Sequence, residues 1–242
     1  MMEHPFPITR YSVIEDIKSD VPLRQRKALE TVIQVYWKPV YMYIRMKWNR
    51  EDESAKDLTQ SFFTVALEKE YLTGFDFGKA KFRTYLRVCI DRFVANELKA
   101  ASRVKRGGKI EIQPFDFQSA ESEYLSELNK STLSPEELFE QEWLRQFFSN
   151  AIDSFKQQCI SEDKELLFEA FQRYDLHESS TESRPSYMEL ADALNVSESV
   201  ITNTLHAARK RFRQILIASL REITASETEF REEAQILFGR FE

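Results

Sequence analysis

Residues 186–213 read SYMELADALNVSESVITNTLHAARKRFR, and this stretch decides the fold prediction. Ser186 and Glu189 have the spacing of a capping box, in which each side chain bonds to the backbone of the other residue, so a helix is expected to begin at Tyr187. Asn195 tolerates the left-handed conformation of a tight turn, and Ser197 can cap a second helix. The stretch therefore predicts a short helix, a four-residue turn and a longer helix.

The longer helix is expected to have an apolar face and a basic end. Its apolar residues recur at steps of three and four: Ile201, Leu205, Ala208, Phe212 and Ile215. This is the layout of a DNA-reading helix-turn-helix, whose second helix enters the major groove. The candidates for contacts with base edges are Ser199, Thr202, Asn203 and His206. The candidates for phosphate contacts are Arg209, Lys210 and Arg213. A plain pair of core helices is the alternative.

The rest of the chain also has helical periodicity. Apolar residues keep this spacing over residues 28–45, 55–66 and 82–93. Pro39 inside the first of these segments predicts a kink or a break, and Ser134 followed by Pro135 predicts a helix start. A helix is expected at residues 164–174 and another within 226–242, where the spaced apolar residues are Phe230, Ala234, Leu237 and Phe241. With only 5 glycines in 242 residues, the chain is predicted to be all-α.

Two adjacent glycines divide the chain. Gly107 and Gly108 open a mixed polar stretch that interrupts the helical periodicity, which predicts a flexible linker over residues 107–134. Two helical domains result, over residues 1–106 and 135–225, followed by a C-terminal extension of residues 226–242.

Several classes of protein are not favoured by the sequence. No apolar run approaches the ~20 residues of a membrane helix, and the chain starts without a targeting signal, so we expect a cytoplasmic protein. Cys89 and Cys159 are expected to be small buried hydrophobes, with neither a disulfide nor a metal. The three histidines are isolated, and there is no phosphate loop or carboxylate cluster. We therefore expect no enzyme activity, cofactor or small-molecule substrate.

The charge is distributed unevenly. The net charge is −6, yet residues 79–109 carry ten basic residues against Asp91 and Glu97, and residues 197–221 carry five basic residues against Glu198. Four polar or basic residues in the first segment follow one another at steps of four, three and four: Arg92, Asn96, Lys99 and Arg103. They would share one helix face that fits a phosphate backbone, and an ordinary solvated face is the alternative.

Together these features resemble bacterial RNA polymerase sigma factors of the extracytoplasmic-function (ECF) type, over roughly residues 9–222. DLTQSFF at residues 57–63 is similar to the helix that grips the coiled coil of the polymerase clamp. FRTYL at residues 82–86 and the helix after it are similar to the segment for promoter melting and minus-ten recognition, and residues 193–212 to the reader of the minus-thirty-five element. TRYS at 9–12, YW at 36–37, FVANE at 93–97 and KRGG at 105–108 are similar to an ECF-like branch with a long linker.

The resemblance implies a promoter-recognition subunit that acts with core RNA polymerase on promoter DNA. It implies that core polymerase is bound by Asp57, Gln60 and Phe63. It implies that the minus-ten DNA is bound and melted by Arg83, Tyr85, Arg87, Arg92, Asn96, Lys99 and Arg103. Phe63 is alternatively a second core aromatic residue, and Tyr85 is alternatively buried. The acidic linker either threads toward the polymerase active site, as in the family, or is merely solvated.

The chain also departs from the family. Acids are usual there at the positions of Ser54, Lys56 and Ser61, and we hypothesise that phosphorylation of Ser54, Thr59 or Ser61 restores the missing negative charge. In the reading helix, Thr202, Thr204 and Ala207 stand where Lys or Arg is common, which predicts weaker phosphate anchoring and a shallow salt dependence. The sequence leaves open whether an anti-sigma factor or a Ser/Thr kinase regulates the protein.

The competing hypothesis is a helix-turn-helix transcriptional repressor whose other helical half binds a ligand or dimerises. Such a protein would bind duplex DNA alone as a symmetric dimer, whereas a sigma factor would bind core polymerase at one to one.

Overall fold

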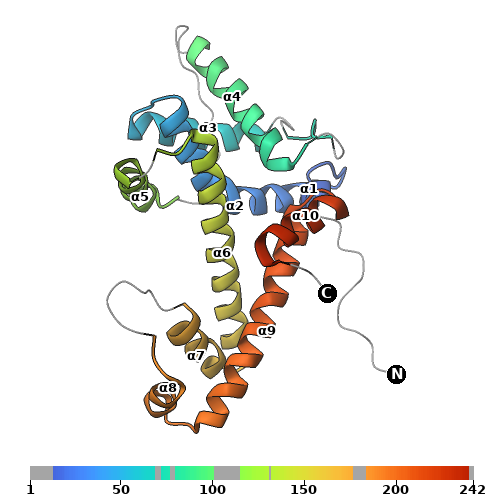
Figure 1. The fold of residues 1–242 in the computed structure, drawn as a ribbon. Coiled ribbons are helices and arrows are strands. Elements are labelled where there is room, and N and C mark those ends of the chain that lie inside the picture. Colours follow the sequence, from blue (N-terminus) through green and yellow to red (C-terminus); the bar gives the residue numbers. More distant parts are fainter. Residues whose placement is uncertain are drawn as a thin grey trace. The chain divides into compact units, whose positions relative to one another are not determined.

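The structure is a computed structural model that describes residues 13–68, 72–76, 80–100, 115–130, 132–176 and 184–239. Every regular element in these residues is a helix, which confirms the all-α prediction (Figure 1). The helices are α1 (Val13–Asp16), α2 (Pro22–Lys47), α3 (Asp52–Glu68), α4 (Phe82–Ala100), α5 (Phe117–Lys130), α6 (Pro135–Ser161), α7 (Glu165–Asp175), α8 (Tyr187–Leu194), α9 (Glu198–Ile223) and α10 (Glu227–Phe238).

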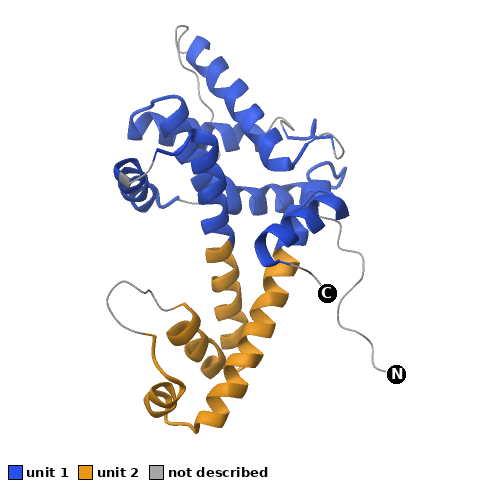
Figure 2. Cartoon of the chain, in the orientation of Figure 1, with its two compact units in different colours: residues 1–147, 220–242 blue, residues 148–219 orange. Residues whose placement is uncertain are grey.

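The chain forms two compact units (Figure 2). Unit 1 comprises Met1–Phe147 and Leu220–Glu242, and unit 2 comprises Phe148–Ser219. Helices α6 and α9 each cross this boundary, so each contributes residues to both units. The division differs from the predicted domains, because the first half of α6 and the C-terminal residues from Leu220 belong to the unit that contains the N-terminal helices.

Helix α2 forms the centre of unit 1. Its residues Tyr36, Tyr41 and Tyr43 are buried, and the ring of Tyr36 lies edge-on to that of Phe82 in α4, with ring centroids 5.8 Å apart. The helix continues through Pro39, so the predicted break is absent. Pro39 is itself buried, as are residues of α2 before and after it. We attribute the unbroken helix to this packing, which outweighs the roughly 3 kcal/mol cost of an interior proline.

Part of the predicted linker is an ordered helix. Phe117 at the start of α5 is buried, and its ring lies 5.2 Å from that of Tyr41 and 5.6 Å from that of Trp37. Glu121 accepts two hydrogen bonds from the Arg45 guanidinium, at 2.6 and 2.9 Å. Residues 117–130 are therefore packed on α2, and the prediction of a flexible linker across them was wrong because apolar and ionic contacts with a distant helix override their polar composition. Gly107 and Gly108 lie outside the described residues.

Unit 2 has an aromatic core. The ring of Phe171 in α7 lies 5.4 Å from that of Phe155 in α6 and 4.9 Å from that of Phe212 in α9. The predicted helix at residues 164–174 is confirmed as α7. Cys159 of unit 2 and Cys89 of unit 1 are both buried and free, as predicted, and burial raises the pKa of both thiols.

The C-terminal extension forms α10, as its periodicity predicted. Ser226 caps the helix by accepting a hydrogen bond from the backbone N–H of Glu229 at 3.1 Å. Phe230 and Ala234 are buried in unit 1, whereas Phe241 lies outside the described residues.

No helix within the described ranges is long and apolar enough to cross a membrane. The same residues contain no group of three or more His, Cys, Asp or Glu side chains placed to hold a metal ion.

Candidate nucleic-acid interface

The helix-turn-helix of unit 2 begins with the predicted capping box. Ser186 Oγ accepts a hydrogen bond from the Glu189 N–H at 3.2 Å, and the Ser186 N–H donates to Glu189 Oε2 at 2.7 Å. These two bonds satisfy backbone donors that the start of a helix leaves without a partner. The hydrogen bonds that the Ser186 N–H and hydroxyl donate to the Glu189 carboxylate lower the pKa of that carboxyl. Helix α8 therefore begins at the residue that the sequence indicates.

The turn between α8 and α9 also follows the prediction. Asn195 has φ 54° and ψ 46°, the left-handed conformation expected from its side chain. Val196 N–H bonds to the Ala191 carbonyl at 3.0 Å, and Ser197 Oγ accepts from the Val200 N–H at 3.4 Å. The angle between the two helices is then fixed by a cluster of Ala170, Leu190, Ala191, Ile201 and Leu205, none of which is more than 5% exposed.

All four predicted base-contacting residues are exposed on α9. They are Ser199, Thr202, Asn203 and His206. Thr202 Oγ1 donates to the Glu198 carbonyl at 3.1 Å, and the Ser199 and Ser197 hydroxyls are 2.9 Å apart. Ile201 and Leu205 of the same helix are buried with residues of α7 and α8, and the polar face of α9 is exposed to solvent and available to a ligand.

The three predicted phosphate contacts, Arg209, Lys210 and Arg213, are exposed as well. Arg209 is also held by α7, because its Nε and Nη2 donate to the two carboxylate oxygens of Asp175 at 2.9 and 3.0 Å. These bonds raise the pKa of Arg209. Its guanidinium lies 5.4 Å from the Tyr174 ring. Asp175 and Tyr174 therefore position Arg209. The helical periodicity of α9 does not point to them, because they precede α9 by more than twenty residues.

Arg211 has a different role within the same basic run. Its guanidinium donates to the Glu162 carboxylate and, at 3.3 Å, to Gln158 Oε1 near the end of α6. The Arg211 and Lys164 hydrogen bonds lower the pKa of Glu162 to about 2. Arg211 thus anchors α9 to the rest of unit 2 and was not among the predicted DNA contacts.

In unit 1, the second half of α4 exposes a polar face. Arg92, Asn96 and Lys99 are exposed, while the apolar stripe of Phe82, Leu86, Cys89 and Phe93 is buried. This agrees with the predicted division of the helix into two faces. Arg103 lies outside the described residues.

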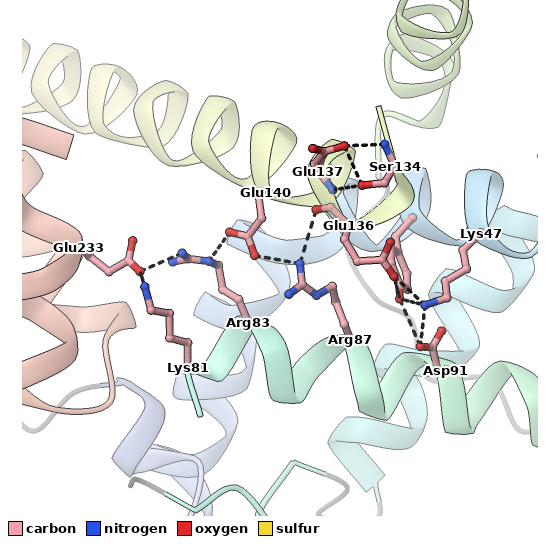
Figure 3. A network of polar contacts seen from close by, with 11 residues as sticks. Lys47, Lys81, Arg83, Arg87, Asp91, Ser134, Glu136, Glu137, Glu140 and Glu233 are labelled. Atoms are coloured by element: carbon pink, nitrogen blue, oxygen red, sulfur yellow. Dashed lines mark hydrogen bonds and ion pairs between the residues drawn. The ribbon is translucent and has the colours of Figure 1, made fainter. Parts of the chain in front are cut away.

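The first half of α4 differs from the prediction, because its cations are bonded within the protein (Figure 3). Arg83 is only 8% exposed, and its guanidinium lies 3.7 Å from the centre of the Trp143 ring. Its Nε donates to Glu140 at 2.8 Å and its Nη2 to Glu233 at 3.0 Å. Burial alone would lower the pKa of Arg83, but its acidic neighbours raise it overall. The prediction that Arg83 contacts DNA was wrong for this conformation, because these three residues enclose its side chain.

Arg87 and Tyr85 lie beside this network. Arg87 Nη1 donates to Glu140 Oε1 at 2.9 Å. Tyr85 is half-buried, and its ring lies 5.3 Å from that of Phe75. Both residues thus contact other side chains of unit 1, and both are less exposed than Arg92.

A second group of ion pairs surrounds Lys47 at the end of α2 (Figure 3). Lys47 Nζ lies 2.7 Å from Glu136 Oε1 and 3.2 Å from Asp91 Oδ2. The Lys47 hydrogen bond is the main cause of the lowered pKa of Glu136. Lys47 of α2 therefore joins the acidic first turn of α6 to α4 through salt bridges.

Helix α3 divides the predicted polymerase contacts. Asp57 and Gln60 are exposed, whereas Phe63 is fully buried, with its ring 5.2 Å from Phe62 and 6.2 Å from Phe115. Phe63 thus fits the alternative of a core aromatic residue and presents no surface to a partner in this structure.

The three candidate phosphorylation sites also divide. Ser54 and Ser61 are exposed, whereas Thr59 is buried and its hydroxyl donates to the Ala55 carbonyl at 2.7 Å. The candidate at Thr59 was therefore wrong for this conformation, because a kinase must reach the hydroxyl that it modifies.

Comparisons with protein-family models, with curated proteins and with solved structures each found no match to this chain.

Proposed function

We propose that the protein is an RNA polymerase sigma factor that binds core polymerase and directs promoter-specific initiation of transcription. The observation that carries this proposal is the helix-turn-helix of unit 2, whose α9 exposes Asn203, His206 and Lys210 on one polar face. An exposed polar and basic face on α4 supports the second DNA contact that such a factor requires. The order of these segments along the chain also agrees with the resemblance to the ECF type.

In this proposal α9 reads the minus-thirty-five element in the major groove. Asn203 can form two hydrogen bonds with an adenine, and Lys210 can bind a phosphate as a point charge. Asp175 holds the Arg209 guanidinium at the edge of this face, which reduces the rotamer freedom that Arg209 would lose on binding phosphate.

The exposed half of α4 binds the minus-ten strand in this proposal. Arg92 and Lys99 supply positive charge for the phosphates, and Asn96 lies between them with donors and acceptors for a base or a sugar. Asp57 and Gln60 on α3 provide a polar contact for the clamp of core polymerase. The protein has the role of a specificity subunit, and the chemistry belongs to core polymerase.

The test is transcription by core RNA polymerase on genomic fragments with the purified chain added. We expect defined start sites, and we expect the D57A/Q60A double variant to lose binding to core while it keeps its affinity for DNA. Arg26 and Glu30 form an exposed ion pair on α2, so R26A/E30A is the control for a double surface change. If no complex with core forms and no transcripts start, the proposal is wrong. Binding of duplex DNA by a symmetric dimer without polymerase would favour a repressor.

A further inference from the structure

Two carboxylates bind the cations at the start of α4 (Figure 3). Glu233 of α10 lies 2.5 Å from Lys81 Nζ and 3.0 Å from Arg83 Nη2. Glu140 of α6 binds Arg83 at 2.8 Å and Arg87 at 2.9 Å. Arg83 and Arg87 lie in the segment that resembles the promoter-melting region, and Lys81 directly precedes it. The protein's own acids therefore bind cations beside the face of α4 that is proposed to bind DNA.

The two carboxylates are held differently. Glu140 lies on α6, the same helix as Trp143, whose ring covers the buried Arg83 guanidinium. Displacement of α6 would therefore open the interior of unit 1. Glu233 lies on the short last helix of the described chain, which contributes two buried apolar residues, Phe230 and Ala234. The other side of α10 is exposed at Arg231, Glu232, Gln235 and Ile236. Displacement of α10 would therefore uncover less apolar surface than displacement of α6.

Lys81 is the cation that both ligands can reach. Its side chain is 36% exposed, whereas Glu233 is 3% exposed, so solvent reaches the ammonium group and hardly reaches the carboxylate. Burial would raise the pKa of Glu233, but Arg83 and Lys81 lower it overall, which keeps the carboxylate charged. A charged carboxylate and a phosphate accept the same charge-assisted hydrogen bonds from lysine.

We propose that α10 is an intrachain cover in which Glu233 takes the place of a nucleic-acid phosphate, and that single-stranded DNA competes with Glu233 for Lys81. This inference rests on the proposed function for the identity of the ligand. The covered state lowers the affinity of the free chain for DNA, because binding must first displace the carboxylate.

The first experiment measures the binding of a fluorescent single-stranded oligonucleotide to the full chain over a series of salt concentrations. We expect Glu233→Gln to bind roughly threefold to tenfold more tightly than the wild type, with a salt slope steeper by about 0.7 for one additional phosphate contact. Glu232→Gln is the matched control, because Glu232 is the exposed neighbour on the same helix. The double variant K81Q/E233Q is expected to lose the gain.

The second experiment does not depend on how well a variant folds. Amide hydrogen exchange of the wild-type chain is measured with and without the same oligonucleotide, and α10 is expected to lose protection when DNA is added. Retained protection of α10 at saturating DNA would overturn the proposal. The proposal would also be overturned if E233Q and E232Q had equal affinities and equal salt slopes while both variants matched the circular dichroism of the wild type.

Both experiments use the free chain and DNA without polymerase, so they can be separated from the test of the proposed function. If α10 opens on DNA but no transcripts start with core polymerase, the cover stands and the sigma-factor proposal fails. If transcripts start but α10 stays protected at saturating DNA, the cover fails and the sigma-factor proposal stands.

Discussion

Helices α4 and α9 are both rich in basic residues, yet Arg83 near the start of α4 and Lys210 in α9 differ in exposure. In α4, Arg83 is buried against Trp143 and bonded to two carboxylates. In α9, Asn203 and Lys210 are exposed. Both helices are rich in positive charge, so the number of charges does not explain why one cation is buried and the other exposed. The explanation lies in the face of the helix on which each cation lies.

The position of Arg83 around α4 explains its burial. Leu86 and Ile90 follow it at steps of three and four, and both are fully buried, so Arg83 continues their apolar stripe. Arg92 follows Arg83 by nine residues, or about two and a half turns, which places it on the opposite side of the helix. Helix α4 therefore has structural cations on one face and ligand-binding candidates on the other.

The largest expected effect is on the structural cation. Arg83→Ala removes one of the two cations bonded to the buried Glu233, and Lys81 remains to pair with it. The loss is therefore placed at the low end of the cost of breaking a buried pair, about 3 kcal/mol. We expect the free energy of unfolding, measured in urea by circular dichroism, to fall by about this amount. Arg92→Ala is the matched variant on the exposed face, and its stability is expected to stay within about 0.5 kcal/mol of the wild type.

DNA binding by the same pair of variants sharpens the contrast. Arg92→Ala is expected to weaken single-stranded DNA binding and reduce the salt slope by about 0.7. If Arg83→Ala were as stable as the wild type and Arg92→Ala bound DNA normally, the division of α4 into two functional faces would be wrong.

The next effect is on the reading face of α9. Asn203→Ala is expected to lose about 1 to 3 kcal/mol of discrimination at one base pair, because the amide can form a bidentate pair with adenine. Lys210→Ala is expected to weaken binding to all sequences about equally and to reduce the salt slope by about 0.9. Neither change should alter stability by more than about 0.5 kcal/mol. Binding of a duplex library to each variant measures both effects.

Gln214→Ala is the control for this experiment, because it removes the same amide group from the same helix. Gln214 is exposed on α9 eleven residues beyond Asn203, or about 16 Å along the helix axis. It is therefore expected to leave the preference at that base pair unchanged. Sequence preferences that remained unchanged in Asn203→Ala as well would remove Asn203 from base recognition.

Local features of the sequence predicted the helix-turn-helix well. The bonds that begin α8 join Ser186 and Glu189, and the turn is made by Asn195 and its near neighbours, so the necessary information lies within a few residues. Arg83 and Glu233 are separated by 150 positions, and periodicity carries no information about which distant carboxylate meets which cation. The phase of Arg83 within the apolar stripe was the available signal for its burial. No comparable signal indicated that α5 packs on α2, because Glu121 bonds to Tyr41 and Arg45, which precede it by 80 and 76 positions.

A smaller effect is expected when the helix caps are removed from the two units. Ser186 caps α8 in unit 2 and Ser226 caps α10 in unit 1, each by accepting from a backbone N–H three residues later. Alanine at either position should cost about 1 kcal/mol. Ser186→Ala is expected to weaken duplex binding through α9, whereas Ser226→Ala is expected to loosen α10 and strengthen single-stranded binding. Chemical denaturation and the two DNA assays measure these outcomes, and the same change in both assays for both variants would contradict the distinction.

The smallest effect concerns Arg211, the cation of α9 that is bonded to Glu162 within unit 2. The carbon-13 shift of the Glu162 side-chain carboxyl should titrate with a midpoint of about 2, because Arg211 and Lys164 stabilise the charged form. Since the pKa in the folded state lies below the ordinary 4.5, the contribution of this pair to stability is complete above pH 4.5 and is lost as the pH falls through about 2. In Arg211→Gln the midpoint should move toward 4.5, whereas duplex DNA affinity should change less than in Lys210→Ala. A midpoint near 4.5 in the wild type would mean that Glu162 does not hold Arg211, and Arg211 would then join the phosphate contacts of α9.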